Sequence, residues 1–171
     1  MKRSGERVAA VIRQVLDTDY SDLARFFEEN DLPEITRYFN PFPLNSQTAH
    51  QIARNDHLDH YYVATLDAQM VGMFMLRGWE EGFQIPSFGI LVDRRYHGMG
   101  LGKQITEFAI TEASNSGCPG IRLSVYASNT NALSLYASFG FREVSRLPAV
   151  VLGQQDEKII MIKDLNNGRS F

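Results

Sequence analysis

A glycine-rich turn between an apolar segment and the next helix constrains this chain most. The residues from Val92 to Lys103 read VDRRYHGMGLGK, with glycine at positions 98, 100 and 102. Glycines at alternate positions let the backbone approach an anion without clashes from Cβ atoms. The free N–H groups in the first turn of a helix point at such an anion, and the helix dipole favours it. The turn therefore predicts a phosphate cradle, and a ligand that carries a pyrophosphate fits it.

A second motif lies downstream of the cradle. Glycine spacing alone is weak evidence, because such turns also serve chain reversal and close packing. The segment 129–141 reads NTNALSLYASFGF and follows a strand-like segment, 121–126. The two motifs in this order resemble the GNAT superfamily of acyl-CoA-dependent N-acyltransferases. The family's cradle is similar to HGMGLG at 97–102, and its second signature matches Asn129, Ala132, Tyr136, Gly140 and Phe141. The resemblance covers about 70 residues, from Met70 to Phe141.

The resemblance implies an α/β (α+β) fold. In this fold a mixed, mostly antiparallel sheet of about seven strands is flanked by helices, and two central strands splay apart. The pantetheine arm of the cofactor inserts between those strands, which here would be 89–92 and 123–126. Without it, their unpaired backbone groups need other partners. We expect a single domain of this type over residues 1–171.

The resemblance also implies acetyl-CoA as the acyl donor. The residues that it assigns to the cofactor are Ile90, Leu91, Val92, His97, Gly98, Met99, Gly100, Leu101, Gly102, Lys103, Asn129 and Tyr136. Asn129 either contacts the cofactor arm or caps its own helix, and Lys103 either contacts phosphate or lies in solvent. His97 stands where the family usually has Arg or Gln. Its side chain adds less fixed charge, although its backbone N–H can still serve the cradle.

Acyl transfer to an amine requires a neutral amine, a stabilised oxyanion and a proton for the leaving thiolate. Tyr136 is the candidate general acid, because its phenol has an ordinary pKa of about 10 and the family places its tyrosine near the sulfur. A buried core tyrosine is the alternative reading. For the oxyanion, the backbone N–H groups of Leu91 or Val92 are the candidate donors.

The general base is not assigned by the resemblance. Many family members carry a glutamate early in the fourth strand, where this chain reads IPSFG at 85–89. Glu80 and Glu81, in the preceding turn, are the nearest carboxylates, and we take Glu81 as the second catalytic candidate. Turn residues are more often exposed to solvent, where one could still orient a water molecule or bind a cationic acceptor. His50 and His60 are weaker candidates.

Composition is typical of a globular protein and limits its partners. The chain has 171 residues, of which 44% are hydrophobic, and a formal net charge of −3. This charge argues against a general nucleic-acid surface, although a basic patch around Arg94, Arg95, His97 and Lys103 is a candidate for holding phosphates. Cys118 is the only cysteine, so an intrachain disulfide and cysteine-based metal sites are excluded, and we predict no metal site.

The cysteine content and the hydropathy of the sequence indicate the cellular location of the chain. A single cysteine makes the reducing cytoplasm the simplest location. Arg13 interrupts the apolar stretch near the N-terminus, so we expect no signal peptide. No apolar run approaches the ~20 residues that cross a bilayer, so we expect no membrane partner.

Apolar periodicity and turn residues predict the order of elements. Helices are expected at 20–29, 47–55, 101–116 and 131–138, and strands at 7–16, 61–66, 71–78, 84–92, 121–126, 141–147 and 158–162. Asp17–Asp19 and Ser46 are the expected caps of the first two helices. Leu23, Phe26 and Phe27 fall on one helical face. The tail 166–171 is expected to fray.

The acceptor is the least constrained part of the function. We predict direct transfer of the acetyl group of acetyl-CoA to the primary amine of a small molecule, with an amino sugar or a sugar nucleotide as candidates. Tyr38, Phe39 and Phe42 either line the acceptor pocket or, as is more common for such clusters, pack in the core. The alternatives are a protein or peptide N-acetyltransferase, another acyl transfer, and a CoA-binding sensor without activity. Family analogy also suggests a homodimer through sheet edges.

Overall fold

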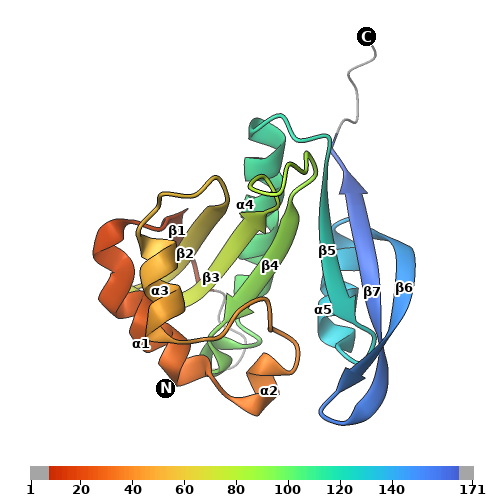
Figure 1. Cartoon of the computed structure of the whole chain (residues 1–171), viewed down its shortest axis with the longest axis horizontal. Coiled ribbons are helices and arrows are strands. Elements are labelled where there is room, and N and C mark those ends of the chain that lie inside the picture. The colour runs from red at the N-terminus through yellow and green to blue at the C-terminus, as the bar shows by residue number, and fades with distance from the viewer. Residues whose placement is uncertain (1–7, 166–171) are drawn as a thin grey trace.

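The computed structural model describes residues 8–165, which form a seven-stranded sheet with helices on both faces (Figure 1). The strands are β1 (Val11–Gln14), β2 (His60–Leu66), β3 (Gln69–Arg77), β4 (Ser87–Val92), β5 (Gly120–Tyr126), β6 (Arg142–Val151) and β7 (Gln154–Asp164). The helices are α1 (Tyr20–Asn30), α2 (Pro33–Thr36), α3 (Ser46–Ala53), α4 (Leu101–Asn115) and α5 (Thr130–Ser138), with 3₁₀ turns η1 (Asp17–Asp19) and η2 (Arg94–Tyr96). The strand order is β1-β2-β3-β4-β5-β7-β6. The predicted fold class is confirmed.

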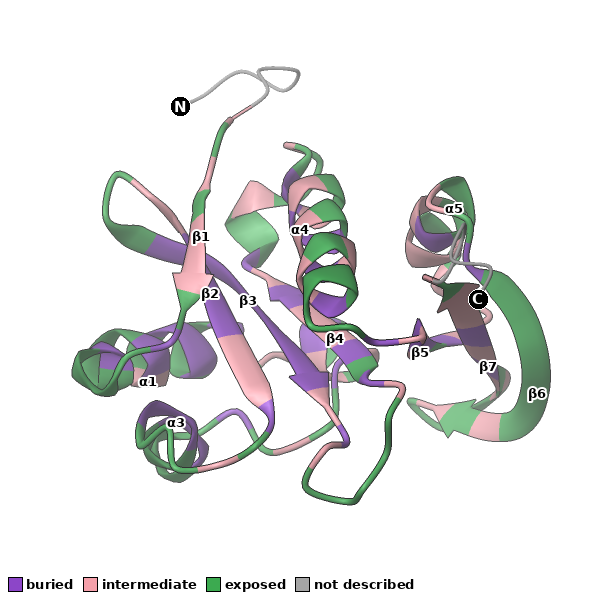
Figure 2. Cartoon of the chain, turned by 90° about the horizontal axis from the view of Figure 1, so that it is seen from above, coloured by how far each residue is buried: buried purple, intermediate pink, exposed green. Residues whose placement is uncertain are grey.

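Helices cover both faces of the sheet. Figure 2 shows α1 and α3 on one face and α4 and α5 on the other, and a separate hydrophobic core lies under each layer. Leu23, Phe26 and Phe27 of α1 are buried, which confirms the predicted helical face. On the opposite side, α4 buries Ile105 and Ala109 against the sheet. The apolar spacing along each helix therefore determines which face packs.

The parallel strands β4 and β5 are paired at one point only. Ser87 is in register with Arg122, and the Arg122 N–H donates to the Pro86 carbonyl over 3.0 Å. The other neighbouring strands pair antiparallel. Beyond the Ser87 pair, β4 and β5 diverge toward their C-terminal ends, as Figure 1 shows. The predicted splay of the central strands is confirmed.

Two helix starts differ from the prediction. Ser46, the predicted cap of α3, is its first helical residue, and the Asn45 side chain caps the helix by accepting the Thr48 N–H over 2.9 Å. Asn and Ser are both good caps, so adjacent positions are hard to separate from sequence. Asp17–Asp19 form η1, and Asp19 holds the predicted N-cap position of α1. Its side chain makes no cap hydrogen bond, because its carboxylate accepts from Arg13 and from the Leu16 N–H instead.

The outer strands also differ in length from the prediction. β1 is confined to Val11–Gln14. Arg7, where the strand was expected to start, and the tail 166–171 lie outside the described residues. β6 and β7 are longer than predicted and form a hairpin that turns at Leu152 and Gly153, with φ of 49° and 77°. Most of β6 is exposed on both faces, so its sequence lacks the alternation that marks a half-buried strand. No helix within residues 8–165 has the length and apolar composition needed to cross a bilayer.

A buried carboxylate ties the end of β1 to the start of α1. The two oxygens of Asp19, which is 7% exposed, accept hydrogen bonds from the Arg13 guanidinium over 2.7 and 2.8 Å. Oδ2 also accepts the Leu16 N–H over 2.8 Å. The hydrogen bonds from Arg13 hold the pKa of Asp19 below its ordinary value. A paired, hydrogen-bonded carboxylate of this kind stabilises the fold in its charged form.

We expect Asp19→Asn to lower the free energy of unfolding at pH 7 by about 1–2 kcal/mol, measured by urea denaturation. Because the pKa of Asp19 is lowered in the folded state, its contribution is complete above about pH 4 and is lost as the pH falls through the folded-state value. The gap between wild type and variant should therefore narrow in acid. Asp22→Asn is the control, because Asp22 also faces an arginine, with its Oδ1 3.3 Å from Arg25 Nη2, but this ion pair is exposed to solvent. An equal loss in both variants would contradict the assignment.

Candidate active site

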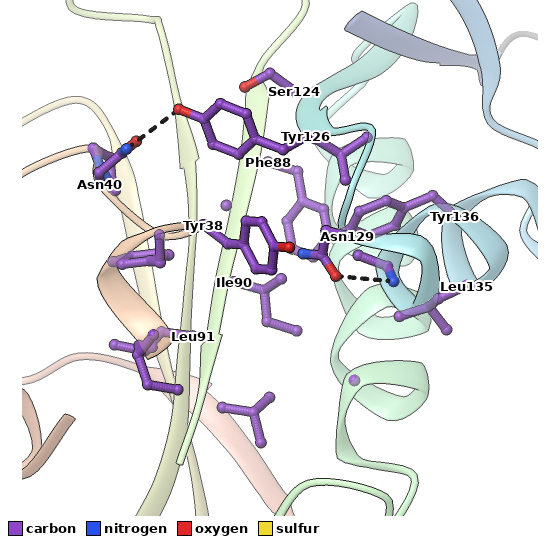
Figure 3. Close-up of a pocket in the computed structure, with 18 of the residues that line it drawn as sticks. Tyr38, Asn40, Phe88, Ile90, Leu91, Ser124, Tyr126, Asn129, Leu135 and Tyr136 are labelled. Carbon is purple, nitrogen blue, oxygen red and sulfur yellow. Dashed lines mark hydrogen bonds between the residues drawn. The ribbon is translucent and has the colours of Figure 1, made fainter. Parts of the chain in front are cut away.

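A cavity of about 1000 Å³ lies between β4 and β5 (Figure 3). Its lining comes from α2 and the loop after it, the end of β3, both gap strands, the start of α4, and α5. The predicted cofactor residues that line it are Ile90, Leu91, Val92, His97, Gly98, Gly100, Leu101, Gly102, Asn129 and Tyr136. Glu81 lines it as well. Met99 lies instead at a second, smaller pocket, and Lys103 lines neither. The fold thus brings both sequence motifs to one cavity.

The glycine turn has the geometry of an anion cradle. Gly98 and Gly100 have φ of 77° and 81°, a left-handed conformation that glycine adopts without strain. A Cβ atom at either position would meet no atom within 4 Å, so both glycines border open space. Gly100 caps α4 without a side chain, so no side chain competes for the first N–H groups of this helix. These groups are available to a phosphate.

The predicted basic patch near the cradle is largely neutralised within the chain. Arg95 Nη2 lies 2.7 Å from both Glu29 Oε2 and Asp93 Oδ2. Arg94 Nη1 lies 3.1 Å from Glu34 Oε1. Both guanidiniums therefore already have carboxylate partners, and recognition of phosphate at this end depends on the backbone more than on these side chains.

The ring and the backbone N–H of His97 form hydrogen bonds to carbonyl groups of nearby residues. Its Nε2 lies 2.9 Å from the Val92 carbonyl oxygen, so Nε2–H donates there. The backbone N–H of His97, a predicted part of the cradle, is directed at the Arg94 carbonyl over 3.4 Å. The side chain therefore sits over the C-terminal end of β4, on a carbonyl that faces the gap.

The backbone N–H and C=O groups of every second residue of β4 point into the gap. Met73 pairs with Leu91, and the Asp93 N–H donates to the Val71 carbonyl over 2.9 Å. Because hydrogen bonding alternates along an antiparallel pair, the N–H of Leu91 also points to β3. The N–H and C=O groups of Ile90 and Val92 then point toward β5. Of the two predicted oxyanion donors, only Val92 faces the gap, and Ile90 joins it.

Tyr136 lies on the α5 side of the gap, where it packs edge-on against Phe88 and Phe141 at centroid distances of 6.3 and 5.9 Å. It is 7% exposed and lines the cavity. Burial raises the pKa of its phenol above the ordinary value. Within residues 8–165 no group is hydrogen-bonded to the hydroxyl. Tyr136 is therefore held as a neutral phenol with a proton to donate.

The other two polar candidates have simpler surroundings. The Asn129 side chain accepts the Ala132 N–H over 3.4 Å, so it caps α5 while also lining the cavity. Glu81 lies exposed in the turn after β3, and it too lines the cavity. Its neighbour Glu80 instead accepts the Leu58 N–H over 2.9 Å. His50 packs edge-on against Tyr20, His60 packs against Trp79, and neither histidine lines this cavity.

The loop after α2 crosses to β5 and closes one side of the cavity. Tyr38 Oη lies 2.9 Å from Ser128 Oγ, and Asn40 Nδ2 donates to Tyr126 Oη over 3.3 Å. Figure 3 shows Tyr38 and Tyr126 facing each other, with ring centroids 6.1 Å apart. Of the predicted aromatic candidates, Tyr38 and Phe39 line the cavity, whereas Phe42 packs against Phe27 and Phe39.

Sequence reasoning missed the polar face of β5. Arg122, Ser124 and Tyr126 alternate with apolar residues and line the cavity. Their neighbours at positions 121, 123 and 125 are buried in the core with α4 and α5. This alternation was the available signal, because it places three polar side chains on the face that the helices leave uncovered.

Known proteins identify the family. The sequence model of the acetyltransferase (GNAT) family matches residues 20–141. The chain belongs to the GNAT acetyltransferase family. Mycothiol acetyltransferase of Jonesia denitrificans is 35% identical over 91 residues, which cover 52% of this chain and 29% of that protein. The [ribosomal protein bS18]-alanine N-acetyltransferase of Escherichia coli is 41% identical over 58 residues, 34% of this chain and 39% of its own length. The chain thus spans less than two fifths of either relative.

Solved structures support the same fold. The structure of yncA from Salmonella typhimurium with acetyl-CoA has a TM-score of 0.79 to this GNAT chain at 18% identity, and covers 95% of this chain and 98% of its own. Acetyl-CoA fits the residues present here on three grounds. The cradle glycines border open space, the first turn of α4 has no side-chain cap, and Ile90 and Val92 present backbone groups to the gap.

We expect Gly100→Ala to raise the Kd for acetyl-CoA at least about tenfold, measured by calorimetry, because the methyl group enters the cradle. Left-handed strain of about 1–2 kcal/mol accompanies it. Gly117→Ala is the matched control: Gly117 follows α4, has φ of 75°, and also borders open space. The two variants should lose similar stability, and only Gly100→Ala should lose affinity. Equal affinity in both would remove the glycine turn from the binding site.

Proposed function

We propose that this chain transfers the acetyl group of acetyl-CoA directly to the primary amine of a small molecule. The observation that carries the proposal is one continuous cavity whose lining includes an anion cradle, backbone groups of a splayed strand and a buried neutral tyrosine. Membership of the GNAT family supports the same reaction. Cys118 is buried and does not line this cavity, so its thiol is not placed to form a covalent acetyl-enzyme, which supports direct transfer.

Different groups that line the cavity have different roles in the proposed reaction. Bound acetyl-CoA supplies an activated acetyl thioester. The first turn of α4 and the cradle glycines hold its phosphates, and we assign stabilisation of the oxyanion to the gap-facing N–H groups of Ile90 and Val92. Tyr136 donates the proton that the leaving thiolate takes up.

Glu81 is the proposed base. Glu34 and Glu81 are the carboxylates among the described residues that line the cavity. Glu34 is paired with Arg94, whereas no ion pair among the described residues involves Glu81. Glu81 is thus the carboxylate free to accept the proton of the incoming amine, directly or through water.

Two other functions are kept as alternatives. Transfer to a protein or peptide N-terminus is favoured by the likeness to the ribosomal-protein-alanine enzyme. A CoA-binding sensor without activity is favoured by the sequence IPSFG at 85–89, which lacks the strand glutamate of many relatives. Amino sugars and sugar nucleotides stay predicted acceptors.

Three further predictions accompany the proposal. A homodimer through the edge strand β6 is supported by the exposed side chains of Leu147 and Val150. A cytoplasmic location is supported by the lone cysteine, Cys118. A single GNAT domain over 1–171 is supported by the family match.

The first test is release of CoA thiol from acetyl-CoA across a panel of amines. The panel contains amino sugars, sugar-nucleotide amines, polyamines, amino acids and peptides with free N-termini. Transfer to at least one small molecule, at a rate well above hydrolysis, is the expected result. Transfer to peptides alone would favour the protein acetyltransferase. Silence across the panel, with acetyl-CoA bound, would favour the sensor.

Tyr136→Phe should lower kcat by about 10- to 100-fold, because the thiolate then leaves without its acid. The Kd for acetyl-CoA and the melting temperature should stay close to wild type, since the hydroxyl has no hydrogen bond within the described residues. With its pKa raised, the phenol stays protonated up to at least about pH 10, so Tyr136 should cause no fall in wild-type activity on the alkaline side. Unchanged turnover in Tyr136→Phe would refute the assignment.

A further inference from the structure

At the end of the cavity opposite the glycine cradle, which we call the acceptor side, three neighbouring strands each contribute one residue to a row. Arg77 of β3 is in register with Ser87 of β4, and Ser87 is in register with Arg122 of β5. Side chains of directly opposed residues project to the same face of a sheet. Since neighbouring strands are about 4.8 Å apart, the two arginine Cα atoms flank the small serine at a separation of roughly 10 Å. Two guanidiniums can therefore converge over Ser87.

Arg122 lacks a partner for its charge. Its Nε is a buried atom without a hydrogen-bond partner among the described residues. No carboxylate of residues 8–165 lies within ion-pair distance of its guanidinium. Buried polar groups are nearly always hydrogen-bonded in native proteins, and a charged donor is the most costly exception. An unpartnered guanidinium that lines a cavity therefore indicates a ligand that supplies the acceptor atoms.

Arg77 forms a long ion pair with Asp59 and no hydrogen bond to it. Its Nε lies 3.8 Å from Asp59 Oδ2. The other oxygen of Asp59 accepts the N–H groups of Gly78 and Trp79 over 2.9 and 3.0 Å. Asp59 thus fixes the end of β3, and its charge is shared between two backbone amides and a loosely paired arginine. One further negative charge is needed to balance the row.

Among the other charged residues that line the cavity, cations outnumber carboxylates. Besides the row, its cationic lining residues are Arg37, Arg94 and Lys158, and its carboxylates are Glu34 and Glu81. Arg94 is paired with Glu34, and Lys158 lies 5.9 Å from the Tyr126 ring centroid. Because Arg94 and Glu34 pair with each other, Glu81 is the carboxylate of the described lining that is left to offset Arg37, Lys158 and the row, so the lining carries a net positive charge. The Tyr38–Tyr126 contact closes one side of the cavity and limits its space. A small anionic molecule matches this environment.

We propose that the acceptor is a primary amine that carries a carboxylate, of the amino-acid class, and that Arg122 together with Arg77 binds this carboxylate. The inference rests on the proposed acetyl transfer and names its substrate class. Guanidinium and carboxylate match in bidentate geometry. From Ser87, Ile90 lies three residues along β4, about 10 Å at the spacing of a strand. A carboxylate over the row thus leaves the amine facing the backbone groups that hold the acetyl carbonyl.

The test compares acids with their amides as acceptors. The probes are alanine, aspartate, glutamate and phenylalanine, each against the same amino acid with its α-carboxylate amidated, and 4-aminobutyrate against butylamine. In wild type, kcat/KM should favour the acid at least about tenfold in one or more pairs. Arg122→Met should reduce that preference to less than about threefold, mainly by raising KM, and Arg122→Lys should restore part of it. Arg25→Met removes an exposed arginine of α1 and should change neither value.

Binding measurements separate this inference from the reaction. The acids are titrated into the CoA-loaded protein by calorimetry, and melting and acetyl-CoA affinity monitor folding of Arg122→Met. If that variant does not fold, Arg77→Met takes its place. Acids that bind wild type but not the variant, with no acetylation of any amine, would keep the carboxylate site and overturn the proposed transfer. Two results would overturn the carboxylate site. One is that neutral or phosphate-bearing amines are acetylated as well as the acids, and the other is that Arg122→Met leaves the preference for acids unchanged.

Discussion

The parallel strands β4 and β5 meet at a single pair of residues, and the site exists because they separate beyond it. From the Ser87–Arg122 pair onward, β4 continues along β3 and β5 continues along β7, so each strand keeps one paired edge and exposes the other to the gap. Backbone groups that are left unpaired and dry destabilise a fold. The gap is thus a stable feature only if water or an extended ligand arm satisfies those groups, which makes it selective for a ligand with amide groups of its own.

Contacts on both sides of the gap hold the two parts of the sheet together. On the α5 side, Phe88 of β4 packs edge-on against Tyr136. On the opposite side, the hydrogen bond between Tyr38 and Ser128 ties the loop after α2 to the segment after β5. The catalytic candidate Tyr136 is therefore also a packing residue. Its position relative to β4 follows from the aromatic contact and does not require a hydrogen bond to its hydroxyl.

The elements that sequence predicted well are those whose pattern reflects burial. The apolar face of α1 and the glycine cradle are local features: one needs only helical spacing, and the other only left-handed backbone next to a helix start. β6 was predicted too short because it is exposed on both faces and carries no alternation. Asn45, and not Ser46, caps α3, and sequence alone does not separate the two because both side chains are good caps at adjacent positions.

The acceptor side could not be predicted in the same way, because Arg77, Ser87 and Arg122 meet only through strand register. Arg77 and Ser87 meet through the register of the β3–β4 hairpin, and Arg122 joins them only after a crossover through α4, which is a non-local connection. The same applies to the charges. In sequence, Arg94 and Arg95 beside the cradle look like the phosphate-binding residues, whereas in the fold both are paired with carboxylates.

Arg94 and Arg95 are each paired with carboxylates, so ligand recognition at the two ends of the cavity relies on different groups: backbone at one end and side chains at the other. At the cradle, the first N–H groups of α4 are available to phosphate in a geometry that does not depend on side-chain identity, so this end suits the common part of an acyl donor. At the other end, Arg122 keeps its charge available, and side-chain identity decides which acceptor is bound. A family built on this sheet can therefore change its acceptor by substitutions at a few strand positions that face the uncovered side of the gap. Arg122, Ser124 and Tyr126 are such positions here, because their side chains face the cavity while their neighbours on β5 stay in the core.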